Sequence, residues 1–239
     1  MKIVLRIKRF LPGTDPAPYD RDYEVEVEPT DRILDALRKV KSEQDGSLSF
    51  RSSCAHGVCG SDAMRIQGQE RLACKTLVKD VTEGPGRVVS VAPLEHMNVQ
   101  RDLMVDQGRF FESYRAVKPF LINDTPLPEK ERLQSPKERA AFDDATACIL
   151  CGSCYSACPV FEKMPQYIGP AALVQAARFL FDSRDLGLSL RHAVLDAPQG
   201  AWACENHFDC TRVCPREIKV TKNINATKAA LSRHKEGGA

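Results

Sequence analysis

Hydrophobic positions alternate with charged ones in two stretches near the start of the chain, residues 3–7 and residues 23–27. Alternation with a period of two predicts strands that bury one face. The period then changes to that of a helix, which we expect to begin at Asp31 after a Thr30 cap and to bury one apolar face. Further short strands are predicted at residues 64–66, 71–74 and 87–91. The first third of the chain is therefore predicted to be small strands around one helix.

From about residue 101 the hydrophobic spacing becomes helical. One buried stripe is predicted to contain Leu103, Phe110, Phe111 and Tyr114. Prolines between residues 119 and 136 predict a connector that wraps the second part of the chain. A helix is expected from Gly169-Pro170 to about Asp185, with Leu173, Ala177, Leu180 and Phe181 on its core face, and a last helix over about residues 222–233. The pattern divides the chain into residues 1–105 and 106–239.

Composition narrows the class of protein. The 239 residues suffice for two ordinary domains, and 43% hydrophobic with 28% charged residues suits a globular protein. A net charge of +2 gives no reason to expect a nucleic-acid partner. No apolar run approaches the length that spans a bilayer, and the alternating N-terminus does not match a signal peptide. We therefore expect an unexported protein on the cytoplasmic side.

Ten cysteines are the main chemical signal. In a chain without an export signal, metal or redox use is favoured over a disulfide framework, which is the alternative reading. The cysteines fall into three groups along the chain: Cys54, Cys59 and Cys74; Cys148, Cys151, Cys154 and Cys158; and Cys204, Cys210 and Cys214.

The first group has the spacing of a plant-type [2Fe–2S] loop, C-x4-C-x2-C, with Asp62 in place of the third cysteine. Cys74 supplies the distant ligand. A carboxylate is a harder ligand than a thiolate, but it is an anion that can complete the shell of iron. The alternatives are that Asp62 is a surface residue, or that His56 is a ligand as in Rieske centres, although no partner histidine has the Rieske spacing.

The second group, Cys148 to Cys158 followed by Pro159, matches the bacterial ferredoxin run C-x2-C-x2-C-x3-C-P. In that run the fourth cysteine ligates the other cluster. Cys214 then completes a [4Fe–4S] set with Cys148, Cys151 and Cys154. Structural zinc is the competing interpretation of such spacing, but the overlapping pairs do not resemble a zinc module.

The third group repeats the run with His207 at the position of one cysteine. Counting ligands leaves Cys158, Cys204 and Cys210 for the last cluster, and three thiolates suit a [3Fe–4S] centre. His207 either binds a fourth iron or leaves that corner empty, and we favour the empty corner.

These motifs closely resemble those of the iron–sulfur subunits of succinate dehydrogenase and quinol:fumarate reductase. The resemblance covers nearly the whole chain. Stretches that carry it lie at residues 47–54, 57–61, 101–106, 148–151, 168–171, 181–185 and 210–215. Some bacterial succinate dehydrogenases also have aspartate at the position of Asp62, which favours the dehydrogenase slightly over the reductase.

The resemblance implies an α+β fold, in which an N-terminal β-grasp [2Fe–2S] ferredoxin-like domain precedes an all-α domain like a bacterial ferredoxin. It implies a flavoprotein partner with FAD, and an integral membrane anchor, often with haem b, at which quinone is reduced. Electrons would pass from flavin through [2Fe–2S], [4Fe–4S] and [3Fe–4S] to quinone. The chain would then lie peripherally on the cytoplasmic face of a bacterial inner membrane.

Pro159 is the one quinone-site residue that the resemblance carries over. Many relatives have a tryptophan shortly after this proline, whereas this chain has Val160 to Met164, so we expect an altered quinone pocket, with menaquinone as a candidate. No serine–histidine–aspartate pattern, phosphate loop or dinucleotide fingerprint is present in the sequence. The chain is therefore expected to conduct electrons without a catalytic residue of its own. The alternatives are the same role in a fumarate reductase and, from a different class, a soluble ferredoxin shuttle.

Overall fold

The computed structural model describes residues 1–82 and 87–237, and the chain packs into two compact units. The first unit comprises Met1–Gln107 together with Ile149–Ala157, and the second comprises Gly108–Cys148 and Cys158–Ala239. The first unit therefore includes a short segment from the middle of the second cysteine group.

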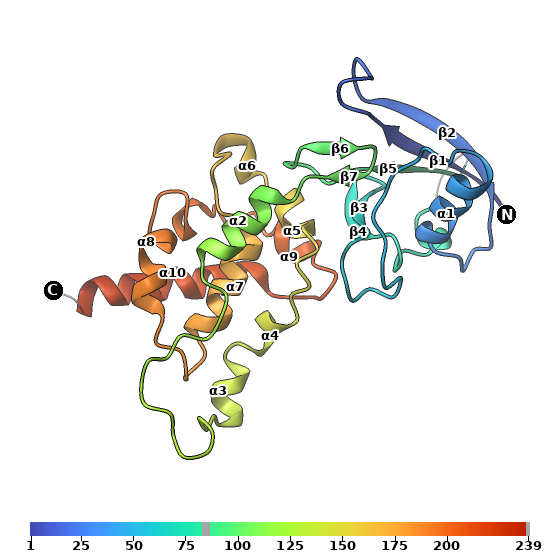
Figure 1. Cartoon of the computed structure of the whole chain (residues 1–239). Coiled ribbons are helices and arrows are strands. Elements are labelled where there is room, and N and C mark those ends of the chain that lie inside the picture. Colours follow the sequence, from blue (N-terminus) through green and yellow to red (C-terminus); the bar gives the residue numbers. More distant parts are fainter. Residues whose placement is uncertain (83–86, 238–239) are drawn as a thin grey trace. The chain divides into compact units, whose positions relative to one another are not determined.

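A mixed five-stranded sheet forms the first unit, with the strand order β2-β1-β5-β3-β4 (Figure 1). Strands β1 and β2 pair antiparallel, β5 joins β1 in parallel, and β3 pairs antiparallel with both β5 and β4. The strands are β1 (Lys2–Arg9), β2 (Tyr19–Glu26), β3 (Ala63–Ile66), β4 (Gln69–Leu72) and β5 (Val88–Ala92). The short 3-10 helix η1 (Val78–Asp80) lies between β4 and β5 in the chain, and a hairpin of β6 (Val99–Arg101) and β7 (Met104–Val105) follows β5.

The core of this unit forms between the sheet and helix α1 (Ile33–Glu43). Ile3, Leu5 and Ile7 of β1 are buried against the apolar face of α1, as the alternation in β1 predicts. The helix begins at Ile33, two residues later than the sequence predicts, because the Asp35 carboxylate accepts the backbone N–H of Arg32 and makes Arg32 the N-cap.

The exposed faces of β1 and β2 carry a ladder of opposite charges. Lys2 lies opposite Glu26, Arg6 opposite Asp22, and Lys8 opposite Asp20. Arg6 and Asp22 form a salt bridge at 2.8 Å, and Lys8 and Asp20 form another at 2.8 Å. Opposite charges directly across two strands favour one register. The basic residues of β1 are therefore the solvated side of a strand.

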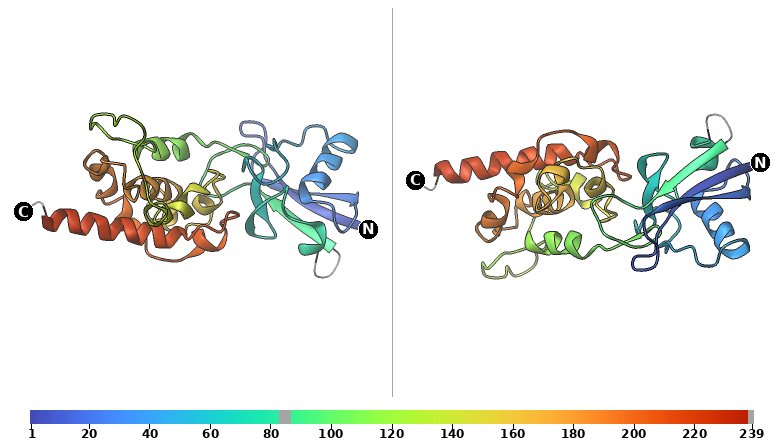
Figure 2. Two further views of the ribbon diagram at one scale, coloured as in Figure 1. Left: turned by 90° about the horizontal axis from the view of Figure 1, so that it is seen from below. Right: turned by 90° about the horizontal axis from the view of Figure 1, so that it is seen from above.

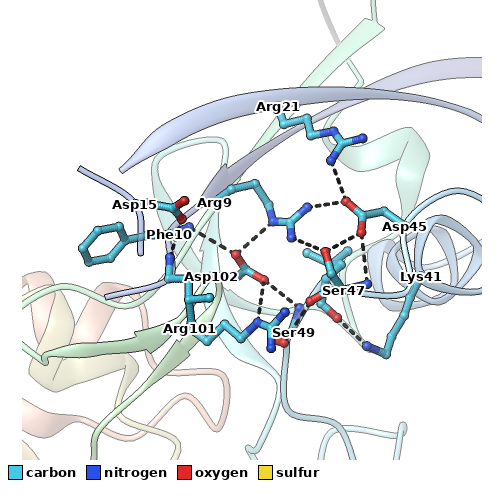
Figure 3. A network of polar contacts seen from close by, with 12 residues as sticks. Arg9, Phe10, Asp15, Arg21, Lys41, Asp45, Ser47, Ser49, Arg101 and Asp102 are labelled. Carbon is cyan, nitrogen blue, oxygen red and sulfur yellow. Dashed lines mark hydrogen bonds and ion pairs between the residues drawn. The ribbon is translucent and has the colours of Figure 1, made fainter. Parts of the chain in front are cut away.

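Arg9 places a charge at the end of the buried face of β1. Its guanidinium donates hydrogen bonds to Asp102 at 2.9 Å, to Asp45 at 2.6 Å and to Ser47 at 2.9 Å (Figure 3). Asp102 also accepts the backbone N–H of Ser49 at 2.9 Å. This network connects the end of β1 with the turn of the β6–β7 hairpin and with the segment that leads to the first cysteines.

Ionisation within the network follows its hydrogen bonds. Burial alone would raise the pKa of Asp45, but hydrogen bonds from Ser47, Tyr23 and Arg9 outweigh burial and hold that pKa well below its ordinary range. Burial and the hydrogen bond to Asp45 raise the pKa of Tyr23 to about 12. The pair of Arg9 and Asp45 is therefore charged at neutral pH.

The second unit is helical. Helix α7 is buried over most of its surface and packs against α10, the long red helix at the C-terminus (Figures 1 and 2). The helices of this unit are α2 (Gly108–Ala116), α3 (Pro136–Ala140), α4 (Asp143–Thr146), α6 (Val160–Lys163), α7 (Pro170–Leu180), α8 (Leu188–Leu195), α9 (Asp209–Arg212) and α10 (Val220–Gly237), with the 3-10 helix η3 (Ala201–Ala203).

A buried arginine fixes the proline-bearing connector on this unit. Arg191 of α8 is fully buried and forms an ion pair with Asp185 at 2.6 Å. Its guanidinium also donates to the backbone carbonyls of Val117, Lys118 and Phe120. The connector is thus held through carbonyl groups, which no pattern in the sequence marks.

Two sequence predictions of buried helix faces need correction. Leu103 is buried, but in the first unit and before α2 begins, and of the other three residues in the predicted stripe only Phe110 is buried. Helix α7 ends at Leu180 rather than near Asp185, and Leu180 and Phe181 are only half-buried. The helix stops early because the Asp182 carboxylate binds Arg184 and its backbone N–H, which favours a turn.

Candidate functional site

The first cysteine group lies in the loop between α1 and β3, with Cys74 just after β4. The thiol of Cys54 accepts the backbone N–H groups of His56 at 3.5 Å and of Cys59 at 3.3 Å. These hydrogen bonds lower the pKa of Cys54 to about 6. A sulfur that is anionic at neutral pH is prepared to bind iron.

Asp62 and Cys74 meet on the inner side of this loop. The Asp62 carboxylate is 2% exposed and accepts the backbone N–H of Cys74 at 2.5 Å. Burial, together with the neighbouring Asp62 carboxylate, raises the pKa of the Cys74 thiol to about 12. A buried thiol beside a carboxylate loses its proton readily only when a cation replaces it, so this pair fits a metal-binding role.

Glycine allows the loop its tight path. Gly57 has a φ of +83°, and a Cβ at Gly57 would lie 2.8 Å from the side chain of Lys75. The backbone N–H of Gly57 also interacts with the Cys74 thiol. The loop therefore presents backbone N–H groups toward the sulfurs from both sides, which suits an anionic iron–sulfur cluster. His56 is exposed.

The second cysteine group is the run of four cysteines from Cys148 to Cys158. Cys151 and Cys154 lie in the first unit, whereas Cys148 and Cys214 lie in the second. Leu150 and Gly152 have positive φ angles of 53° and 84°, and the chain then turns into helix α5 (Ser153–Ser156). The thiol of Cys151 donates to the hydroxyl of Ser153 at 3.4 Å. The grouping of these four cysteines remains a prediction from their spacing.

The predicted donors of the third cluster, Cys158, Cys204 and Cys210, lie close together within the second unit. Cys158 and Cys210 are buried, and burial together with the nearby sulfurs of Cys210 and Cys204 raises the pKa of Cys158 to about 12. Burial also raises the pKa of Cys210. The three thiols face one recess, which is lined by Cys158, Pro159, Val160, Tyr167, Pro170, Cys204–Cys210, Thr221 and Ile224. Pro159, the N-cap of α6, also lines this recess, and its assignment to a quinone site stays a prediction.

His207 lies at the rim of this recess and is bound by its neighbours. Its Nε2 lies 2.9 Å from the Glu205 carboxylate, and Lys163 forms an ion pair with the same carboxylate at 3.1 Å. Lys163 and His207 lower the pKa of Glu205. One ring nitrogen of His207 is thus engaged by a carboxylate at the position where the ferredoxin run has a cysteine.

Sequence reasoning missed the supports that α10 provides. Thr221 lies 3.6 Å from the sulfur of Cys210 and 3.0 Å from the hydroxyl of Thr211, and Lys228 donates to the backbone carbonyl of Cys204 at 2.7 Å. Thr221 and Lys228 come after the last cysteine. No signal marks them except the helical periodicity of the segment that holds them.

All ten cysteines lie within the described residues, and none of them forms a disulfide bond. Within residues 1–82 and 87–237, no helix has the length and apolar character needed to cross a membrane.

Comparison with known proteins agrees with these features. Residues 4–112 match the 2Fe-2S iron-sulfur cluster binding domain family, and residues 144–218 match the 4Fe-4S dicluster domain family. The chain is 42% identical to the succinate dehydrogenase iron-sulfur subunit of Coxiella burnetii over 97% of its length and 98% of that protein. It is 39% identical to the fumarate reductase iron-sulfur subunit of Mycobacterium tuberculosis, over 98% of its length and 94% of that protein.

A solved structure is similar over nearly the whole chain. The structure, titled as the Mycobacterium smegmatis Sdh1 complex in the apo form, matches with a TM-score of 0.86 and 27% identity. The match covers 98% of this chain and 97% of that one. The mixed sheet with a helical second part is therefore a fold shared with known proteins, as the sequence predicted.

Proposed function

The chain belongs to the iron–sulfur subunits of the succinate dehydrogenase and fumarate reductase family, and from this premise we propose how its donors share out the clusters. Four donors, Cys54, Cys59, Asp62 and Cys74, hold [2Fe–2S]. Four thiolates, from Cys148, Cys151, Cys154 and Cys214, hold [4Fe–4S]. Three thiolates, from Cys158, Cys204 and Cys210, hold [3Fe–4S].

The approach of Asp62 to Cys74 carries the first assignment. Asp62 is buried, and its carboxylate accepts the backbone N–H of Cys74 and lies beside the Cys74 thiol. An anion in such a place is costly unless it is compensated, and iron provides that compensation. The same reasoning supports Asp62 as the fourth donor rather than as a surface residue.

Three thiols in one recess support the third assignment. The thiols of Cys158, Cys204 and Cys210 face the recess, while Glu205 engages one nitrogen of His207. With that engagement, the corner where a fourth thiolate would bind has no cysteine. A three-iron centre follows from this donor count.

Each cluster, when bound, takes up and returns one electron, while the chain supplies ligands, hydrogen bonds and burial. Backbone N–H groups around Cys54 stabilise extra negative charge on the first centre. Buried Cys158 and Cys210 place the third centre in drier surroundings. Hydrogen bonding and burial are the properties that set the potentials of such centres.

We propose that the chain works between two partners. A flavoprotein subunit with FAD supplies electrons taken from succinate, and an integral membrane anchor, with haem b in some relatives, provides the site where quinone is reduced. Pro159, beside Cys158, is assigned to the quinone end. The chain then sits peripherally on the cytoplasmic face of a bacterial inner membrane, held by the anchor. Val160–Met164 favours menaquinone as the acceptor.

A fumarate reductase is the second candidate, because relatives that carry this name are 37–39% identical to the chain. The reaction is the same in reverse, and the potential of the quinone decides its direction.

A complex that turns over faster with succinate and a ubiquinone analogue than with a menaquinone analogue would count against the menaquinone assignment.

Electron paramagnetic resonance of the intact complex, poised at several potentials, tests the proposed clusters. We expect three separate signals, one for each centre, with the three-iron signal present in the oxidised sample. Two signals, or a third centre that is silent when oxidised, would contradict the assignment.

A further inference from the structure

Gly60, the residue after Cys59, lies directly against Cys151. A Cβ at Gly60 would be 2.6 Å from the Cβ of Cys151, 2.9 Å from its Cα and 3.3 Å from the carbonyl oxygen of Ile149. Real Cβ atoms do not approach other atoms this closely, so only glycine permits the contact. Gly60 also has a φ of +69°, and Cys151 is 9% exposed. Both residues belong to the first unit.

Separate contacts hold the Cys151 segment in this place. The hydroxyl of buried Ser156 donates to Glu70 of β4 at 2.8 Å and accepts the backbone N–H of Glu95 at 2.8 Å. Gly152 packs its backbone near Leu94 and Met97. The segment is therefore fixed at both ends, and the close approach of Gly60 to Cys151 is a feature of a well-anchored backbone.

We propose that the contact between Gly60 and Cys151 is the route by which an electron leaves the first cluster for the second. The inference rests on the proposed function, in which Cys59 and Cys151 are ligands of those two centres. One electron passes from the centre bound by Cys59, which is oxidised, to the centre bound by Cys151, which is reduced. No proton moves and no bond forms or breaks.

The physical reason is the distance that the electron must cross through the packed atoms of the protein. Thiolate ligands share the electron density of their cluster, so the path between two centres is shortest where their ligand-bearing backbones touch. Electron tunnelling weakens steeply with each added gap, and close packing removes such gaps. A side chain at position 60 would act as a wedge against backbone atoms, which cannot give way as a flexible side chain does.

The test compares Gly60→Ala with Gly68→Ala in the assembled complex. Gly68 has a similar φ of +74°, but a Cβ there would meet nothing within 4 Å. The two variants therefore introduce the same backbone strain, and only Gly60→Ala disturbs the contact. The readouts are iron content, the midpoint potentials, the magnetic interaction between the two reduced centres, and the rate of electron transfer between them after flash photoreduction with freeze-quenching.

We expect Gly60→Ala to retain its iron and potentials while it weakens the magnetic interaction and slows the transfer several-fold, with Gly68→Ala unchanged. Equal interaction and equal rates in the two variants, with all clusters present, would overturn the proposal. If Gly60→Ala loses either of these two clusters, Ser156→Ala decides, because it loosens the Cys151 segment without touching a ligand or Gly60. An unchanged interaction in Ser156→Ala then refutes the route.

The wild-type complex separates this inference from the proposed function. If either of the first two signals is missing from the wild type, the cluster assignment fails. If both are present and Gly60→Ala has no effect, only the route fails.

Discussion

At the scale of single residues, Asp62 is the donor that most distinguishes the first site. Replacing Asp62 with cysteine changes one ligand from oxygen to sulfur, so we expect Asp62→Cys to keep the [2Fe–2S] cluster and alter its electron paramagnetic resonance line shape. Asp80→Cys, which changes an exposed aspartate of the same unit, is the matched control. A spectrum that is the same in wild type and Asp62→Cys would show that Asp62 does not touch iron.

His207 gives the second residue-scale prediction. Because a cysteine at this position restores the complete ferredoxin run, we expect His207→Cys to add about one iron per chain and to convert the third centre to [4Fe–4S] with a lower potential. His207→Ala should keep the three-iron signal of the oxidised centre. Iron analysis and spectroscopy of both variants test this prediction. A His207→Cys variant that gains no iron would contradict the assignment of Cys158, Cys204 and Cys210 to the third cluster.

The sequence predicts the donors because cysteine spacing indicates which chain segments can wrap a cluster. The sequence did not reveal the residues that support the cysteines, because Thr221 and Lys228 are distant in sequence from the cysteines that they contact. Nor did it reveal that Glu205 binds His207, because the two residues are close in sequence but only their side-chain directions bring the carboxylate to the ring.

At the scale of elements, the Arg9 network joins β1 to two distant segments. Asp102→Ala leaves a buried guanidinium without one of its carboxylate partners, so we expect a loss of about 3–5 kcal/mol in the free energy of unfolding. The control is Asp22→Ala, which breaks an exposed Arg–Asp pair between β1 and β2 and should change stability much less. Urea unfolding followed by circular dichroism compares the two, and equal losses would contradict the importance of burial here.

The pH dependence of this network follows from Asp45. Its pKa is lowered in the folded chain, so its charge stabilises the fold above the ordinary pKa of 3.8, and this stabilisation is lost as the pH falls through the folded pKa. Asp45→Asn should therefore lower the urea midpoint at pH 7. The difference from wild type should shrink below about pH 4.

Acid also removes the clusters, but it does so in both proteins, so the difference between their midpoints reports Asp45. A difference that stays constant from pH 7 to pH 3 would mean that the carboxylate does not act through its charge.

The elements show where pattern reasoning works and where it stops. The alternation of Ile3, Leu5 and Ile7 predicted β1 and its buried face correctly. The same alternation continues to Arg9, but a charged residue at a buried position is not expected unless its partners are known, and Asp102 lies 93 residues away. Helix α7 likewise ended early at a local Asp182–Arg184 turn that the helical period does not report.

At the scale of the whole molecule, the donor count predicts the metal content. Clusters of two, four and three irons require about nine irons and about ten inorganic sulfides per chain. Analysis of non-haem iron and inorganic sulfide in the purified complex, normalised to this subunit by quantitative mass spectrometry, measures both. If the clusters are shielded by the protein, treatment with an iron chelator under native conditions should leave the iron and sulfide content unchanged. A content of about one metal ion per chain with no sulfide would instead support the structural zinc interpretation.

The α+β fold was predictable because its two parts differ in hydrophobic period and carry different cysteine motifs. The sequence could not predict that residues 149–157 belong to the first unit. This placement depends on contacts between residues far apart in sequence, such as the hydrogen bond from Ser156 to Glu70. The division at residue 105 stays a prediction drawn from the change of period.

The charge ladder on β2 has one more consequence. Strand β2 is the outer strand of the sheet, and its solvent face presents Asp20, Asp22, Glu24 and Glu26 in alternation. If the free edge of β2 paired with the same edge of another copy, acids would stand opposite acids, and that arrangement is unfavourable. The acids on β2 therefore disfavour the association of two copies of the chain through this edge.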